Sequence, residues 1–499
     1  MHTRRHFLKT VILGATAGPG LAGCQRDVPA ASPAPRAGRA KQLRGDAFET
    51  CHAVRDGMTL PTGDAAQSHD IVIVGGGPSG LSTAHLLRDR DVLLLEKEEA
   101  FGGSCLLDEW EGVKFSTGGA FYTGSETEVI ALFAEVGARG MRVEGGDSIV
   151  IDGRPVTRFF EDGADALPFP QKARDDFKRS RDDMLALLRK RKPQELDRVS
   201  FAELLKGYDP LVTQFWDRFG PSNWGGVAAD TSGYVGAEAY TWAGGADDPR
   251  WTFPGGMGGG AKALADWLKP KLGDRMVTGA AVYRVQRERK GALVRYLKDG
   301  EPRTVRARVV VVALGKFYAT HLVPDLPAPQ SEAMRQYRYI PFPTFNICLT
   351  SAGPEPAYDN WFLDAPFTDF IPADWVIHSG RGPKQRKTAL TVYHPLPEVR
   401  RKELLADDLV LAMADAVVDA LERHFPGTLP KIAEIRAFRR GHPMLVAAPG
   451  RMSLVERAAA PFGPILFANT DSEATVPSFD GALRAATRAA GQARKLLQA

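Results

Sequence analysis

Hydrophobic positions in this chain form short runs that polar and glycine-rich segments separate, a pattern that predicts a mixed α/β fold. Residues 71–74 and 92–95 are continuous apolar runs, which is typical of parallel strands buried on both faces. Residues 81–87, between these runs, have the composition of a helix. The pattern therefore predicts a strand–helix–strand unit that begins near residue 70.

Later segments predict a second group of elements. The stretches 339–351 and 387–397 are apolar enough to form strands, and residues 406–425 have the composition and length of a helix. The charged run at 172–198 is typical of a helix with a solvated face, and the alternative is a helix that rests on anionic lipid.

The first apolar run, residues 11–22, is too short to cross a bilayer as a helix. Arg4, Arg5 and Lys9 precede it and small residues lead to Cys24, which is the order of a signal peptide. The two arginines resemble a twin-arginine export signal, and the Leu-Ala-Gly-Cys sequence ending at Cys24 resembles a lipobox. We therefore expect the twin-arginine machinery to export the chain, which then sits outside the cytoplasm, held at a bacterial membrane surface by lipidated Cys24. The alternative is a disordered basic tail.

Residues 25–69 follow this signal and predict a tether. The segment 25–42 is rich in proline, alanine and charge and offers little to bury. Residues 43–68 include Cys51 and His52 but no Cys-x-x-Cys-His, so a c-type haem is not expected. We expect a linker that lies along the folded domain.

Composition narrows the function classes. The 499 residues are 44% hydrophobic and 25% charged, the ordinary balance of a globular protein. The net charge is +4 and falls to about +1 without Arg4, Arg5 and Lys9, so no nucleic-acid partner is expected. Four scattered cysteines make neither a disulfide framework nor a zinc site, and no metal is expected.

A glycine motif joins the first predicted strand to its helix. Gly75, Gly77 and Gly80 form G-x-G-x-x-G, and Glu96 follows the second strand about twenty residues later. In such a unit the glycines allow a tight turn, close approach of a pyrophosphate and close packing of helix on strand. The helix N-terminus attracts the phosphates, and the acid binds ribose hydroxyls. The spacing therefore predicts a dinucleotide site.

Further motifs make the prediction more specific. The segments "LLLEKEEAFGGS" and "VKFSTGGAFYTG" resemble the N-terminal part of the flavin-containing amine oxidase and phytoene desaturase superfamily. The later segments "WTFPGGMGGGAKALADWL", "MVTGAAVYRVQRE" and "ARVVVVALG" resemble successive parts of the same family. "GPILFANTDSEATVPSFDGALRAATRAAGQARKLL" resembles its C-terminal flavin motif.

This resemblance implies an FAD-dependent oxidoreductase with an amine-oxidase-like architecture: a Rossmann-like FAD-binding domain interleaved with an α+β substrate domain. The implied FAD domain comprises residues 70–123, 251–315 and 435–499, and the substrate domain residues 124–250 and 316–434. The implied FAD-binding residues are Gly75, Gly77, Pro78, Ser79, Gly80, Glu96, Lys97, Gly102, Gly103, Ser104, Gly118, Gly119, Val282, Asp471, Phe479 and Asp480. Among these, the resemblance places Asp471 near the ribityl-phosphate and the start of the final helix at the flavin.

The catalytic side departs from the amine oxidase pattern. Many such enzymes carry a lysine on the strand that corresponds to residues 339–351, whereas this chain has Asn346, Ile347 and Cys348 there. His442 falls where some relatives attach flavin through cysteine, and it is the catalytic candidate. Its three interpretations are a proton relay near the flavin, a covalent flavin link and a structural histidine.

Cys105 is expected to be a small buried residue rather than a redox thiol. Trp224, Trp242 and Trp251 are expected to be core residues, and the alternative is a cage for a cationic substrate.

The preferred function is oxidation of a C–N bond of a small amine or polyamine, with a hydride equivalent passing to flavin N5. One alternative is C–C desaturation of an apolar, carotenoid- or porphyrinogen-like substrate. The other is a flavin-binding protein with little turnover. Acidic and aromatic residues in the cleft would favour the first function, an apolar tunnel the second and a plugged cleft the third.

Overall fold

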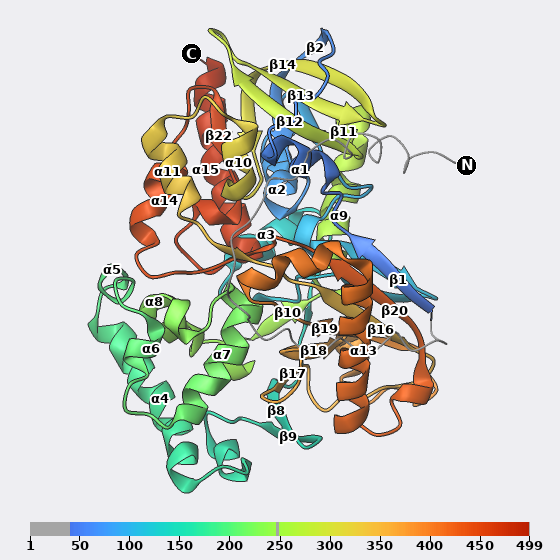
Figure 1. Cartoon of the computed structure of the whole chain (residues 1–499), viewed down its shortest axis with the longest axis vertical. Helices are drawn as coiled ribbons and strands as arrows, with labels where there is room; N and C mark the ends of the chain where they lie inside the picture. The colour runs from blue at the N-terminus through green and yellow to red at the C-terminus, as the bar shows by residue number, and fades with distance from the viewer. Residues whose placement is uncertain (1–39, 246–248, 499) are drawn as a thin grey trace, which may run out of the picture. The chain divides into compact units, whose positions relative to one another are not determined.

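The computed structural model describes residues 40–245 and 249–498, and two large sheets organise this part of the chain (Figure 1). The expected signal peptide, residues 1–24, and the first part of the expected tether, residues 25–39, lie outside the described residues. No described helix has both the length and the apolar character needed to cross a membrane. The mixed α/β architecture, with each sheet built from distant segments, confirms the predicted fold class.

The first sheet contains the predicted strand–helix–strand unit. Its strands are, in spatial order, β11 (Met276–Val277), β3 (Val92–Leu95), β2 (Ala65–Val74), β14 (Glu301–Val312), β13 (Ala292–Lys298) and β12 (Ala280–Arg287), with β22 (Ile465–Phe467) paired to β14. Strand β2 runs parallel to β3 and β14. Both faces of β2 are buried over residues 71–74, which explains the continuous apolar run there.

Helices cover both faces of this sheet (Figure 1). Ile71 and Ile73 share a core with α2 (Pro78–Leu86), α9 (Gly256–Leu272) and α15 (Phe479–Gln498). Val72 and Val74, on the opposite face, share a core with α10 (Lys316–Leu322) and α11 (Ala328–Arg335). The C-terminal helix α15 therefore packs beside α2, the helix that follows the glycine motif.

The second sheet has eight strands. Their spatial order is β1 (Ala40–Gly45), β20 (Ile432–Arg439), β16 (Thr344–Leu349), β19 (Thr388–Tyr393), β18 (Asp369–Pro372), β17 (Asp359–Phe362), β8 (Asp147–Ile151) and β9 (Arg154–Thr157). One face packs on α13 (Asp407–His424) through residues such as Phe345, Ile347 and Val392. The alternate residues of the same strands face the other way, and the site is built on that face.

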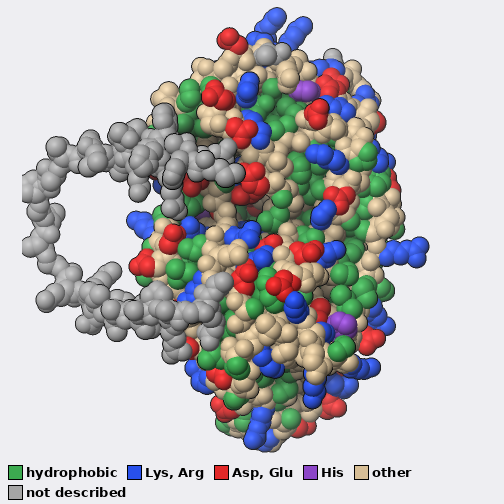
Figure 2. All heavy atoms as spheres, turned by 90° about the vertical axis from the view of Figure 1, so that its right-hand side faces the viewer, with side chains coloured by type: hydrophobic (Ala, Val, Ile, Leu, Met, Phe, Trp, Pro, Cys, Tyr) green, Lys and Arg blue, Asp and Glu red, His purple; other side chains and the backbone are tan. Residues whose placement is uncertain are grey.

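A group of helices joins the edge of the second sheet and has an aromatic core. It comprises α4 (Gln171–Lys190), α5 (Pro193–Leu196), α6 (Phe201–Leu204), α7 (Pro210–Trp224) and α8 (Gly233–Ala239). Cations of α4 pair with acids, as in Lys172–Asp176 (2.6 Å) and Lys178–Asp165 (2.7 Å), as expected for a solvated face. Figure 2 shows the same mixture of acidic and basic side chains over the face it displays.

Short elements connect these parts. They are β4 (Leu107–Trp110), β5 (Val113–Ser116), β6 (Tyr122–Thr123), α3 (Thr127–Glu135), β7 (Met141–Arg142), β10 (Arg250–Thr252), β15 (Tyr339–Ile340), α12 (Trp375–His378), β21 (Met444–Leu445) and α14 (Met452–Ala458).

Residues 40–69 form part of the fold, and the prediction of a linker there was wrong. Strand β1 pairs in parallel with β20, α1 (Glu49–Arg55) follows, and β2 begins at Ala65. Strand β1 pairs through its backbone, so its polar sequence carried no signal of it. We call residues 40–64 the N-terminal arm.

Two predicted domain boundaries also differ from the structure. Helices α10 and α11, predicted in the substrate domain, pack on the first sheet because their apolar side chains join its core. Strand β20 lies in the second sheet between β1 and β16, although residues from 435 onward were predicted in the FAD domain.

Candidate active site

A cavity of about 1480 Å³ is lined by residues of both large sheets. Pockets for a small ligand usually measure about 300–1,000 Å³, so this cavity has room for a dinucleotide together with a substrate. Most of the residues predicted to bind FAD line it: Gly75, Gly77, Pro78, Ser79, Glu96, Lys97, Gly103, Ser104, Gly118, Gly119, Val282, Phe479 and Asp480.

The glycine loop is shaped for close approach. Gly75 has φ +103°, and its N–H donates to the Leu95 carbonyl (2.8 Å) at the end of β3. Helix α2 begins directly after Gly77 and presents its N-terminus to the cavity. The Ser79 hydroxyl is buried and has no hydrogen-bond partner among the described residues. An orphaned donor beside a helix N-terminus fits the pyrophosphate of a dinucleotide.

Glu96 is fixed at the cavity by backbone donors. The N–H of Gly76 donates to its Oε2 (2.6 Å) and the N–H of Glu98 to its Oε1 (2.9 Å). Burial raises the pKa of Glu96, and these two hydrogen bonds oppose the rise. The carboxyl is thus held in one orientation at the position where the motif places a ribose.

Lys97 lies beside it, between two acids, and bonds to both Asp46 and Glu98. Burial acts to lower the pKa of Lys97, but the attraction of these two carboxylates outweighs it and raises the pKa. Asp46 belongs to the N-terminal arm, so Lys97 ties the arm to the cavity wall.

The second glycine segment packs directly on the first. The Gly102 N–H donates to the Gly76 carbonyl (2.9 Å), and a Cβ on Gly103 would lie 2.8 Å from the Cα of Gly77. Gly119 donates to the Ser104 carbonyl (3.0 Å). Two glycine-rich segments, distant in sequence, thus form one continuous floor.

Arg440 is a cavity residue that sequence reasoning missed. Its guanidinium donates to the carbonyl and the hydroxyl of Thr117 (2.6 Å each) and, at 3.3 Å, to the Gly103 carbonyl. Burial lowers its pKa, although arginine stays charged. The only signal was its place in "RRGHPM", two residues before His442.

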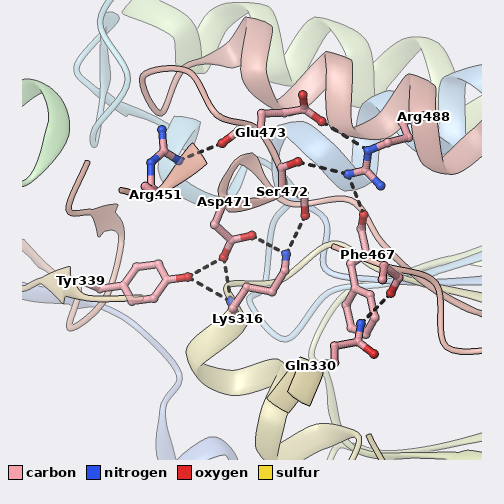
Figure 3. A network of polar contacts seen from close by, with 10 residues as sticks. Lys316, Gln330, Tyr339, Arg451, Phe467, Asp471, Ser472, Glu473 and Arg488 are labelled. Carbon is pink, nitrogen blue, oxygen red and sulfur yellow. Dashed lines mark hydrogen bonds and ion pairs between the residues drawn. The ribbon is translucent and has the colours of Figure 1, made fainter. Parts of the chain in front are cut away.

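Asp471, which was predicted near the ribityl-phosphate, is not among the residues that line the cavity. Figure 3 shows its contacts. Its Oδ1 accepts from the Lys316 ammonium (2.6 Å), and its Oδ2 from the Lys316 N–H (2.7 Å) and the Tyr339 hydroxyl (2.5 Å). Both side chains of the ion pair are fully buried. The neighbouring Asn469 and Thr470 line the cavity instead.

Two other predicted residues, Gly80 and Gly102, also lie outside the lining and shape the loops from behind. A Cβ on Gly80 would stand 1.8 Å from the Gly75 carbonyl oxygen, so only glycine fits there. Gly102 has φ +143°, a conformation that suits glycine.

Lys316 is not the lysine that the family pattern places on the strand at 339–351, because α10 carries it and Asp471 and Ser472 occupy its ammonium. On β16, Asn346 donates to the Thr391 hydroxyl (2.9 Å) and, at 3.3 Å, to the Ser116 carbonyl. Its Oδ1 is buried without a partner among the described residues.

His442 lines the cavity and stacks on Phe317, with ring centroids 4.3 Å apart and planes inclined by 17°. Burial lowers its pKa to about 4, with a smaller contribution from Arg401. The imidazole is therefore neutral near pH 7 and is a poor proton donor, which favours a packing role. Burial also raises the pKa of Cys105 to about 11, as expected for a small buried thiol.

We call the part of the cavity that is lined by the second sheet and its neighbouring helices the chamber. Strand register brings its residues together: Tyr393 lies opposite Thr344 on one side and Asp369 on the other, and Asp369 lies opposite Trp361. The Tyr393 hydroxyl donates to the Gly118 carbonyl (2.8 Å) and so joins the chamber to the glycine floor. The chamber lining also includes Ser222, Asn223, Glu238, Trp242, Asp359 and Ile371.

Two buried acidic residues, Asp359 and Asp369, line the chamber. They interact electrostatically with each other and are only 4% and 2% exposed. Burial raises the pKa of Asp369 to about 7 and that of Asp359 well above its ordinary value. Arg250 opposes the rise at Asp359 only in part, because Asp147 binds its guanidinium in a buried bidentate pair and itself raises the pKa of both carboxyls. The Oδ1 of Asp359 has no partner among the described residues.

The three tryptophans singled out in the sequence, Trp224, Trp242 and Trp251, have different roles. Trp242 lines the chamber, and both it and Trp361 contact Phe219, with centroids 5.4 and 4.3 Å away. Trp224 is a core residue that donates to the Thr231 hydroxyl (2.8 Å), and Trp251 packs against the core of the first sheet. Aromatic faces beside acids are a suitable environment for a cationic ligand.

Comparison with known proteins agrees with this geometry. Residues 78–494 match the model of the flavin-containing amine oxidoreductase family. The Mycobacterium tuberculosis protein named "Putative flavin-containing monoamine oxidase AofH" is 26% identical over 469 residues, which are 86% of this chain and 97% of that protein. Amine oxidase [flavin-containing] A of Bos taurus is 35% identical over 92 residues, only 18% of either chain.

Solved structures show the same fold. Putrescine oxidase bound to putrescine has a TM-score of 0.66 and 20% identity, over 87% of this chain and 99% of that chain. Cyclohexylamine oxidase from Brevibacterium oxydans IH-35A has a TM-score of 0.66 and 19% identity, over 87% and 100% of the two chains.

Proposed function

The chain belongs to the flavin-containing amine oxidoreductase family, and from that premise we propose that it oxidises a C–N bond of a cationic small molecule, an amine or polyamine. It is an FAD-dependent oxidoreductase. The observation that carries the proposed substrate is the carboxyl pair Asp359–Asp369 beside Trp361 in a buried chamber. A cationic substrate would stabilise the ionised form of these carboxyls, whereas an uncharged carotenoid- or porphyrinogen-like substrate would offer them no such partner.

One set of cavity residues would bind the cofactor, and another set would bind the substrate. The glycine loop, Ser79 and Glu96 would hold the pyrophosphate and ribose of FAD, and FAD supplies the acceptor for the hydride equivalent. The carboxyl pair attracts the ammonium form of the substrate into the chamber, and its ionised member can accept the proton that the amine must lose before oxidation. Water then hydrolyses the imine product.

The first prediction concerns this carboxyl pair. The double variant Asp359→Asn, Asp369→Asn should need about 10- to 100-fold more amine for half-maximal reduction of the flavin, since hydrogen bonds to charged groups contribute about 1.5–3 kcal/mol. The advantage of wild type over the variant should shrink as the pH falls through about 7, because Asp369 of the wild type is then protonated and neutral and attracts the amine less. The ratio of wild type to variant removes the ionisation of the amine itself.

The measurement is anaerobic bleaching of the flavin absorbance against amines, polyamines and apolar alkenes. Asp364→Asn is the matched control, because Asp364 lies between β17 and β18 with a side chain 55% exposed. Bleaching by alkenes alone would contradict amine oxidation and support C–C desaturation. Bound flavin that no compound reduces would indicate a protein with little turnover.

We further propose that the enzyme is an exported lipoprotein anchored through Cys24. Arg4, Arg5 and the lipobox support this, and a route that carries folded proteins suits a chain that binds FAD before export. Replacing both arginines by lysine should leave the protein in the cytoplasm, as cell fractionation would measure. The control makes the same change at Arg36 and Arg39, in the expected tether. Normal export of the Arg4→Lys, Arg5→Lys variant would contradict the proposal.

A further inference from the structure

The N-terminal arm is a part of the cavity wall that the family match does not include. The match begins at residue 78, whereas the arm spans residues 40–64. Cavity-lining residues of the arm include Arg44, Asp46, Phe48, His52 and Arg55. These side chains belong to the same cavity as the ribose acid Glu96 and the strand residue Val282. The arm also contacts Lys97, Glu98 and β12, and so lies where the adenosine half of FAD is expected.

The arm is fixed on the β20 side of the cavity. Strand β1 pairs with β20 from Ala40 opposite Glu434 to Gly45 opposite Arg439. Directly after it, Asp46 bonds to Lys97, and the N–H of Ala47 donates to Glu98 Oε1 (2.9 Å). Lys97 and Glu98 directly follow Glu96, so the arm is attached next to the acid that is expected to bind the ribose.

The arm is also fixed on the β12 side. Helix α1 packs against both α10 and β12, and Cys51 and Val54 join the core of the first sheet. Farther along, the Tyr283 hydroxyl donates to the Pro61 carbonyl (2.5 Å) and the Thr304 hydroxyl to the Gly63 carbonyl (2.6 Å). The arm thus crosses the cavity from the second sheet to the first.

We propose that the N-terminal arm is a clasp over the adenosine half of FAD. FAD then leaves only when β1 separates from β20, and bound FAD in turn holds the arm in place. The arm is a cofactor-binding element outside the family's matched region, and it is independent of the substrate proposed above.

Gly45 offers a specific way to open the clasp. Its φ is +136°, and a Cβ there would lie 2.5 Å from the carbonyl oxygen and 2.8 Å from the amide nitrogen of Arg439. Gly45→Ala therefore forces β1 away from β20. Gly57→Ala is the matched control, because Gly57 is also in the arm at positive φ (+77°) but a Cβ there would meet nothing within 4 Å.

The experiment measures FAD release and arm exposure in the full chain. Gly45→Ala should release FAD about tenfold faster or more, since several backbone hydrogen bonds are lost, and Gly57→Ala should stay within about twofold of wild type. Trypsin should cut after Arg44 and Arg55 faster in Gly45→Ala than in wild type. FAD should slow these cuts in wild type, which is a readout that needs no substrate.

Asp46→Ala is a second variant. It removes one of the two acids that hold Lys97, adds no trypsin site and should also speed release. Unchanged FAD release in variants whose arm trypsin cuts rapidly would overturn the clasp. Equal cleavage of wild type with and without FAD would overturn it as well.

Discussion

Replacing Gly80 with alanine is expected to give a protein that no longer retains FAD. A Cβ at this position would stand 1.8 Å from the Gly75 carbonyl oxygen and 2.9 Å from its carbonyl carbon, and both are backbone atoms. The added methyl group must push α2 off the loop or open the loop itself. Overpacking of this kind costs about 1–3 kcal/mol or more, so we expect FAD affinity to fall at least about 10- to 100-fold.

Titration of the apoprotein with FAD, followed by flavin fluorescence, measures this loss. Gly491→Ala is the control, because Gly491 is also a helical glycine, in α15, and a Cβ there would meet nothing within 4 Å. That change should leave FAD binding intact and stabilise the helix by up to about 1 kcal/mol. FAD affinity equal to wild type in Gly80→Ala would show that the loop does not bind the pyrophosphate as described.

Replacing Lys316 with methionine should be the most destabilising single change in the network of Figure 3. The change leaves Asp471 fully buried without its cation. Burial lowers the pKa of Lys316 and the Asp471 carboxylate opposes this, so each charge depends on the other. Removing one partner of a buried pair usually costs about 3–5 kcal/mol of unfolding free energy.

The double variant Lys316→Met, Asp471→Asn tests that reason. It leaves no buried charge, and the amide oxygen can still accept from the Tyr339 hydroxyl and the backbone N–H of residue 316, so a large part of the loss should be recovered. Urea unfolding measures both variants. Lys172→Met is the control: its ion pair with Asp176 is just as short (2.6 Å), but the lysine side chain is 64% exposed and should contribute little. A small loss in Lys316→Met would mean that water or rearrangement satisfies Asp471.

Features that depend on a few consecutive residues were predictable from the sequence. The strand before Gly75, the glycine loop and Glu96 were among them, because turn geometry and helix packing fix their spacing locally. The ion pair of Asp471 was not predicted although its motif was recognised. Its partner Lys316 lies 155 residues away, and no local pattern announces such a pair.

The chamber could not be predicted for a related reason. Asp359, Asp369 and Tyr393 come together through the register of β17, β18 and β19, and a shift of one residue would turn them to the opposite face. The N-terminal arm was missed because strand pairing uses the backbone, which every residue has. Arg440 was missed because one arginine among many carries no signal until its acceptors are known.

The place of β1 in the second sheet has one more consequence. It is the outermost strand, and β20 lies directly inside it. A molecule whose β1 has separated presents the bare N–H and C=O groups of β20 along an open sheet edge, which is a template for pairing with another chain. Protein in which β1 has separated is thus liable to self-association. Strand β1 protects against aggregation by covering the edge of β20.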